Sequence, residues 1–188
     1  MNIDAHNWLG MVFRLQLSAF TLLLTACNLP QPQADAVRSF TLSAPAAVTP
    51  VAGAVQVRPV QIAGHLRGRP MAVRVADYEV VYLEEMRWAE SLDEALTSML
   101  RARLGAVGGG ATVEVTVVRC ELVRSEGNTV QLSATYTISR AGTAPAERGS
   151  FTAPPRVWDG RDYSGVVALL HAAIADLGDA IAAAVEKK

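Results

Sequence analysis

A cysteine at position 27 is the residue whose surroundings most favour covalent chemistry. A cysteine thiolate is a good nucleophile and can be alkylated under mild conditions. Cys27 directly follows an apolar run, residues 15–26, of about a dozen residues, whereas a helix needs about 20 to cross a bilayer. That length, together with Arg14 ahead of it, is typical of the apolar region of an export signal. The sequence therefore places a reactive thiol at the end of a signal segment.

The residues around this thiol resemble the bacterial lipobox, in which a branched apolar residue and two small residues precede a lipidated cysteine. They are Leu24, Thr25, Ala26 and Cys27. The resemblance implies a signal peptide over residues 1–26, which starts at either Met1 or Met11 and is cleaved before Cys27. It also implies diacylglycerol on the thiol and an acyl chain on the new amino group, with no other cofactor. Three acyl chains, at about 0.8 kcal/mol per buried methylene, would anchor the protein permanently.

The residues after Cys27 predict where the anchored protein resides. Asn28 replaces the aspartate that favours inner-membrane retention in enteric bacteria, so we expect the outer membrane, on its periplasmic face. Residues 27–38 carry two prolines and no apolar periodicity, which predicts a tether reaching about 30 Å at roughly 3.1 Å per residue. Removing residues 1–26 from 188 leaves 162, and we expect residues 39–188 to form one domain.

Outside this motif the sequence offers little for catalysis or metal binding. His6, His65 and His171 lack the spacing of a metal site, so we predict none. We find no G-x-S-x-G or phosphate-loop motif, and the glycine-rich stretch at residues 105–110 is better explained as a connection. A net charge of −1 with interspersed acids and bases excludes a basic nucleic-acid-binding stripe. We therefore predict no catalytic residue and a protein that is not an enzyme.

Three further positions admit both a structural and a chemical interpretation. Cys120 has no other cysteine to pair with once Cys27 is lipidated, so we expect a small buried apolar residue. Glu84 and Glu85 are adjacent in a predicted strand and point to opposite faces, which favours solvated charges over a carboxylate pair. Trp88 could close the core over the next helix or stack on a ligand, and the sequence leaves both open.

The most distinct element is a helix that begins after Ser91 and ends at Gly105. Ser91 and Glu94 have the spacing of a capping box. Apolar residues recur at helical spacing between these limits: Leu92, Leu96, Met99, Leu100 and Leu104. A second helix is expected from about Ser164 to the C-terminus, with an apolar stripe of Val167, Leu170, Ile174, Leu177, Ile181 and Val185.

In the remaining segments apolar and polar residues alternate, which is typical of strands. We expect strands over residues 39–42, 55–62 with an edge or a bulge at Pro59, 71–75, 78–83, 112–123, 130–139 and around Phe151. The two strands on either side of Ala76 and Asp77 should form a hairpin. In residues 112–123 the apolar positions change phase at Val117 and Val118, which predicts a β-bulge. The pattern indicates an α+β fold, an antiparallel or mixed sheet with two helices packed on one face.

Taken in order, these segments resemble the ABC-type transport auxiliary lipoprotein family (PqiC-like lipoproteins of MCE transport systems). The matching segments are LTAC (24–27), SFTL (39–42), VRPVQIAGHLRGRP (57–70) and RWAESLDEAL (87–96). The most specific part is Arg87, Trp88, Ala89 and Glu90, which leads into the capped helix as it does in the family. The chain departs from the family pattern at Phe40, where an aromatic pair is more typical, and at Cys120, where a larger apolar residue is expected.

The resemblance implies a non-enzymatic auxiliary component of an MCE lipid-transport system that maintains the cell envelope. Its partners would be an MCE-domain protein with its inner-membrane complex, and the outer membrane through the anchor; it leaves a homo-oligomer open. The Arg87–Glu90 motif would then serve the structure or contact a partner. Two other classes stay open: a lipoprotein that itself binds a lipid or peptide in an apolar pocket between sheet and helices, and an envelope hydrolase with a nucleophile beside a base.

Overall fold

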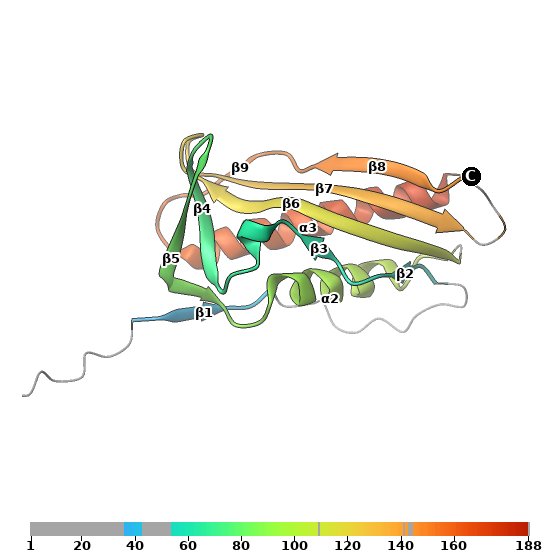
Figure 1. Cartoon of the computed structure of the whole chain (residues 1–188), viewed down its shortest axis with the longest axis horizontal. Helices are drawn as coiled ribbons and strands as arrows, with labels where there is room; N and C mark the ends of the chain where they lie inside the picture. Colours follow the sequence, from blue (N-terminus) through green and yellow to red (C-terminus); the bar gives the residue numbers. More distant parts are fainter. Residues whose placement is uncertain (1–35, 43–53, 109, 141, 143–144, 188) are drawn as a thin grey trace, which may run out of the picture. The chain divides into compact units, whose positions relative to one another are not determined.

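A long antiparallel hairpin of two strands, β6 (Ala111–Val123) and β7 (Thr129–Arg140), forms the centre of the fold (Figure 1). The computed structural model describes residues 36–42, 54–108, 110–140, 142 and 145–187. The turn between the two strands contains Gly127 and Asn128, both with positive φ (71° and 57°). Glycine and asparagine tolerate this left-handed conformation, which explains why the chain reverses here.

The other strands join this hairpin in one mixed sheet of order β1-β5-β4-β6-β7-β8. They are β1 (Arg38–Phe40), β4 (Pro70–Ala76), β5 (Glu79–Trp88) and β8 (Glu147–Thr152), with the short β2 (Gln56–Val57), β3 (Gln61–Ile62) and β9 (Arg156–Val157). β2 and β3 pair with β6, and β9 pairs with β7. At Pro59, where we expected a sheet edge or a bulge, the strand is interrupted, because Pro59 lies between β2 and β3. The expected hairpin is confirmed, with its two-residue turn at Asp77 and Tyr78, one position later than predicted.

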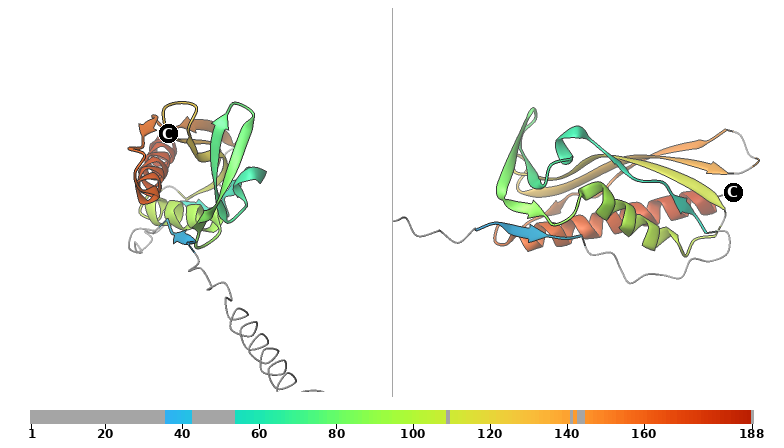
Figure 2. Two further views of the ribbon diagram at one scale, coloured as in Figure 1. Left: turned by 90° about the vertical axis from the view of Figure 1, so that its left-hand side faces the viewer. Right: turned by 60° about the horizontal axis from the view of Figure 1, so that its bottom comes forward.

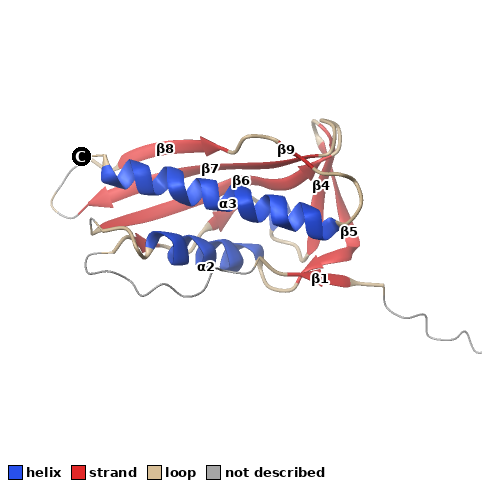
Figure 3. Ribbon diagram, turned by 180° about the vertical axis from the view of Figure 1, so that it is seen from behind, coloured by secondary structure: helices blue, strands red, loops and turns tan. Residues whose placement is uncertain are grey.

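Two helices, α2 (Leu92–Leu104) and α3 (Tyr163–Glu186), cover one face of the sheet (Figure 3). The predicted α+β fold is therefore confirmed. All five apolar residues expected on the inner side of α2 are buried. The predicted capping box is wrong in its detail: Ser91 occupies the N-cap position, but its side chain makes no capping hydrogen bond.

The predicted bulge in β6 is present at Val118, where the pairing with β7 shifts by one residue. Before it, Val113, Val115 and Val117 are buried; after it, Cys120 and Leu122 pair with Leu132 and Val130. Val118 itself is 47% exposed. The extra residue exchanges the two faces of the strand, because side chains alternate with a period of two. It therefore turns Glu121 away from the helices.

α3 is long and apolar enough to span a membrane by length and composition, with a mean hydropathy of 1.7 over its most apolar 18 residues. In the fold it packs against α2 and the central strands, so its apolar stripe is core (Figure 2). Five of its six predicted core residues are buried, and Val166 takes the buried place expected for Val167. The Asp162 side chain caps its start by accepting from Ser164 N–H (2.9 Å).

Candidate functional site

The lipobox residues lie outside the residues that the structure describes. Leu24, Thr25, Ala26 and Cys27 therefore remain predicted sites, as does the tether before residue 36. β1 begins at Arg38, where the described chain enters the sheet, one residue before the expected strand. The candidate site that the structure does describe is the region around this point of entry.

The motif Arg87–Glu90 lies where β1 meets β5. Phe40 pairs with Trp88 in the parallel register of the two strands. The Trp88 N–H donates to the carbonyl of Arg69 (2.8 Å), and the Ala89 N–H donates to the carbonyl of Phe40 (2.7 Å). The motif therefore connects three segments that are distant in sequence: β1, the loop before β4, and the start of α2.

The side chains of the motif are also engaged within the fold. Trp88 is 5% exposed and belongs to the core, so its ring faces are not open to a ligand from solvent. Arg87 Nε donates to the carbonyl of Glu84 (2.7 Å), and its Nη2 lies 3.3 Å from Glu84 Oε2. The hydroxyl of Thr41 donates to Glu90 Oε1 (2.8 Å). These contacts give the motif a role in holding the entering chain against the domain.

A cavity of about 10 Å³ lies between the sheet and the helices beside Trp88. Its lining includes Leu66, Met71, Trp88, Cys120, Tyr163 and Leu170. That volume admits about one water molecule, whereas pockets for drug-sized ligands span roughly 300–1,000 Å³. Cys120 is buried here as predicted, and burial, with a smaller contribution from Glu121, raises the pKa of its thiol to about 12. Such a thiol is protonated and unreactive at neutral pH.

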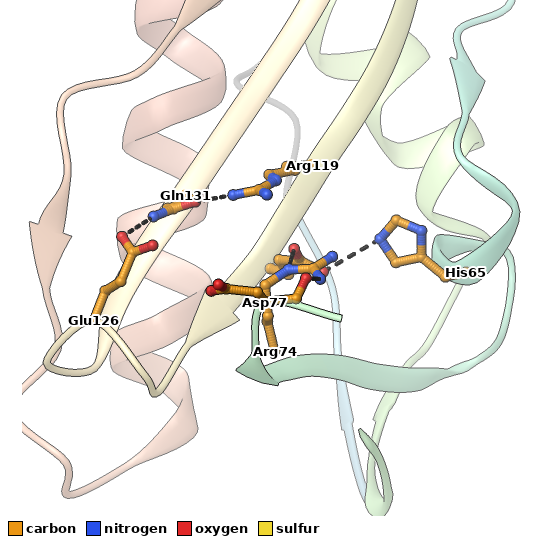
Figure 4. A network of polar contacts seen from close by, with 7 residues as sticks. His65, Arg74, Asp77, Arg119, Glu126 and Gln131 are labelled. Carbon is orange, nitrogen blue, oxygen red and sulfur yellow. Dashed lines mark hydrogen bonds and ion pairs between the residues drawn. The ribbon is translucent and has the colours of Figure 1, made fainter. Parts of the chain in front are cut away.

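The opposite face of the sheet carries a buried polar cluster that the sequence did not predict (Figure 4). Glu121, whose side chain has no exposed surface, accepts from Arg74 Nε at 2.6 Å. Its second oxygen lies 3.2 Å from His65 Nε2, but neither atom has a hydrogen bond within the described structure. The only signal in the sequence was the predicted bulge, which decides the face on which Glu121 lies.

The cluster extends along the same face through a second set of contacts. Arg119 Nη1 donates to Gln131 Oε1 (2.8 Å), and Gln131 Nε2 donates to Glu126 Oε2 (2.6 Å). Arg74 Nη1 also donates to the carbonyl of Asp77 (3.1 Å). Among the described residues no three His, Cys, Asp or Glu side chains are grouped to hold a metal ion. The arrangement connects β4, β6 and β7 through side chains, which is a structural role.

An open groove of about 520 Å³ lies farther along this face, between the β2–β3 connection and the central hairpin. Its side chains are mainly polar: Arg58, Gln61, Glu114, Thr116, Thr135 and Thr137. Acyl chains bind in apolar enclosures, because burying polar groups without partners is unfavourable. The groove therefore does not provide the apolar pocket that a lipid-binding lipoprotein needs.

Comparison with known proteins agrees with this geometry. The sequence model of a protein family, the ABC-type transport auxiliary lipoprotein component, matches residues 40–182, more than half of the chain. The chain belongs to the ABC-type transport auxiliary lipoprotein family. Its residues Arg87–Glu90 and the helix α2 lie within the matched range.

Solved structures share the fold of this auxiliary lipoprotein. The crystal structure of an uncharacterized protein, 20% identical, superposes with a TM-score of 0.66 over 80% of this chain and 99% of that chain. A DUF330 protein from Xanthomonas campestris, 16% identical, has a TM-score of 0.60 over 77% of this chain and 91% of that chain. Identities this low support the fold alone. A search of curated proteins finds no match.

Family membership supports two general statements about function. The protein is a transport-associated auxiliary component, a role that is typical of a protein that is not itself an enzyme. It belongs to a family of lipoproteins, whose members are attached to membranes.

Proposed function

We propose that this auxiliary lipoprotein is held on the periplasmic face of the outer membrane and assists an MCE lipid-transport system that maintains the envelope. The observation that carries the proposal is the family match over residues 40–182, in a chain whose residues 24–27 resemble a lipobox. Asn28, in place of aspartate, favours the outer membrane. The partner would be an MCE-domain protein attached to an inner-membrane complex that supplies the energy.

The proposed role is to hold and dock rather than to catalyse. Lipids on Cys27 would be the only non-protein groups, and Leu24, Thr25 and Ala26 would direct cleavage before it. The contacts of Arg87–Glu90 suit this role, because they hold the start of the domain where the tether enters. The alternative of a lipoprotein that itself encloses a lipid has no support in a cavity of about 10 Å³.

Two measurements test the proposal. Mass spectrometry of the protein from its native membrane should find an N-terminal Cys27 with diacylglycerol and an amide-linked acyl chain. The variant Cys27→Ser should lose the lipid, so that its mass spectrum contains no acylated N-terminal peptide. An unmodified Cys27 in the native protein would contradict the anchor.

The second measurement addresses the partner. Tagged wild-type protein, purified from solubilised membranes, should retain an MCE-domain protein identified by mass spectrometry. Cys27→Ser is the matched control for anchoring, because it leaves the folded domain unchanged. Repeated purification without an MCE-domain protein would contradict the proposed transport system.

A further inference from the structure

The strand β5 has an unpaired edge along most of its length. β4 pairs with one side of β5, whereas β1 pairs with the other side only at Met86, Arg87 and Trp88. Over Glu79–Glu85 no described strand occupies that side (Figure 1). The N–H and C=O groups of such an edge can add a strand from another protein. Within Glu79–Glu85 the carbonyl of Glu84 already accepts a hydrogen bond from Arg87 Nε.

Two exposed tyrosines lie at this edge. Tyr78, in the turn before β5, is 101% exposed and Tyr82 is 46% exposed. They are two of the four large apolar side chains exposed among the described residues; the others are Val118 and Val157. Tyr78 has no packing role in the fold, since its whole side chain is in solvent. Tyrosine is among the residues that contribute most to binding when an interface covers them.

The edge also has an acidic character. Glu79 and Glu85 are exposed and make no ion pair with any described residue. Two cations next to the edge are engaged within the fold: Arg74 pairs with the buried Glu121, and Arg87 pairs with Glu84. A complementary partner must therefore bring positive charge.

Charged side chains on an edge strand also prevent unwanted pairing, and this accounts for the glutamates. It does not account for the two tyrosines, which increase the apolar area exposed at the same edge. A phosphate-bearing membrane surface is a poor alternative partner, because it would repel Glu79 and Glu85. The combination of a free edge, exposed aromatic rings and unpaired carboxylates fits a cationic strand.

We propose that Glu79–Glu85, with Tyr78, is a docking edge that binds an extended, positively charged segment of a partner protein. The partner's backbone would continue the sheet beyond β5, its cations would face Glu79 and Glu85, and its apolar residues would cover the tyrosines. The inference rests on the proposed function in that the expected partner is the MCE-domain protein. The binding chemistry itself can be tested separately.

The first experiment uses the full mature lipoprotein in detergent and a blocked peptide of alternating lysine and valine, seven residues long. The peptide should shift the NMR amide signals of residues 79–85 and bind at least about tenfold more tightly than a peptide with glutamate in place of lysine. The double variant Glu79→Lys/Glu85→Lys should reverse that preference. Tyr78→Ala should weaken binding at least about fivefold, and its full exposure ensures that the fold is unaffected.

Matched controls make the same kinds of change elsewhere. Val157→Ala removes an apolar side chain that is 72% exposed, and Glu186→Lys reverses an exposed charge. Both should bind the lysine peptide as the wild type does. Equal binding of the two peptides, or signal shifts away from residues 79–85, would overturn the docking edge.

The second experiment repeats the purification of the MCE-domain protein with these variants. Loss of that protein from Tyr78→Ala and Glu79→Lys/Glu85→Lys, but not from the controls, supports the docking edge. Equal retention by all variants overturns it and leaves the proposed function standing. If the lysine peptide binds at the edge and no variant retains an MCE-domain protein, the edge stands and the proposed partner is wrong. Self-association that only the edge variants abolish would make a second copy the occupant and overturn the proposal.

Discussion

Glu121 carries a charge in a place where water cannot reach it. Its ion pair with Arg74, 13% exposed, offsets the cost of removing both groups from water. Replacing Glu121 with Ala leaves the Arg74 charge without its partner, so we expect a loss of about 3–5 kcal/mol in the free energy of unfolding in urea. Glu114→Ala, at an exposed site on the same strand, should change it by less than about 0.5 kcal/mol. Equal changes in the free energy of unfolding for Glu121→Ala and Glu114→Ala would show that burial of the ion pair does not matter for stability.

Asp162 at the start of α3 makes stability depend on pH. The hydrogen bond from the Ser164 N–H, with further help from Arg38, holds the pKa of this carboxyl below its ordinary value of 3.8. Because the folded-state pKa is below the unfolded one, the carboxylate stabilises the fold above pH 3.8, and this stabilisation is lost as pH falls through the lowered pKa.

The variant Asp162→Asn measures this contribution, because asparagine keeps a capping oxygen and removes the charge. In thermal unfolding the wild type should have the higher midpoint at neutral pH. The difference should shrink as pH falls below 3.8. A difference that stays constant through this range would assign the effect to capping geometry and not to charge.

At the level of residues, the sequence was informative only where local rules apply. Burial of Cys120, expected for a thiol with no disulfide partner, is confirmed, and of the two roles left open for Trp88 the structure shows the one in the core. The contact between Arg74 and Glu121 joins positions 47 residues apart, and the contact with His65 depends on how the segment after β3 folds back. Such pairs depend on the register of strands that are neighbours in the sheet but distant in sequence, which no local pattern encodes.

The cap of α2 gives a prediction at the level of elements. An N-cap serine usually contributes about 0.5–2 kcal/mol through its side-chain hydrogen bond. Ser91 makes no such bond, so Ser91→Ala should reduce the free energy of unfolding by less than about 0.5 kcal/mol. Urea unfolding measures the change. A loss in the usual range would mean that the serine hydroxyl caps the helix in solution.

The edge strand β8 depends on a glycine that faces an aromatic ring. Gly149 pairs with Tyr136, and a Cβ at Gly149 would overlap the Tyr136 ring. Gly149→Ala must displace that half-buried ring, at an expected cost of about 1–3 kcal/mol in the free energy of unfolding. Gly64→Ala is the matched control, since nothing lies within 4 Å of its added Cβ. If the two variants are equally stable, the ring moves without cost.

Elements with strong internal patterns were predicted well, and elements defined by their partners were not. The α2 stripe and the β6 bulge were visible because each follows from the periodicity of one segment. The parallel pairing of β1 with β5 and the two-residue strand β9 were not predicted. Both are too short to show a period, and both exist because a distant strand offers hydrogen bonds.

For the whole molecule, the described core is one connected cluster that includes both sheet and helices. Residues 37–188 form one compact unit by their contacts, and single domains of about this size usually unfold in one step. Trp88 and Trp158, 5% and 7% exposed, report the core by fluorescence, while circular dichroism reports the helices. The two signals should give the same urea midpoint. Separate midpoints would show that sheet and helices unfold independently.

Under the proposed anchoring through Cys27, the position of β1 has a mechanical consequence. Three paired residues and the buried Leu42 hold the entering chain, and Arg38 lies 3.1 Å from Asp162 at the start of α3. A pulling force on the tether, directed along β1, would slide this strand lengthwise past β5. The hydrogen bonds between β1 and β5 would then have to break together. The attachment would resist a steady pull better than a strand peeled away one bond at a time.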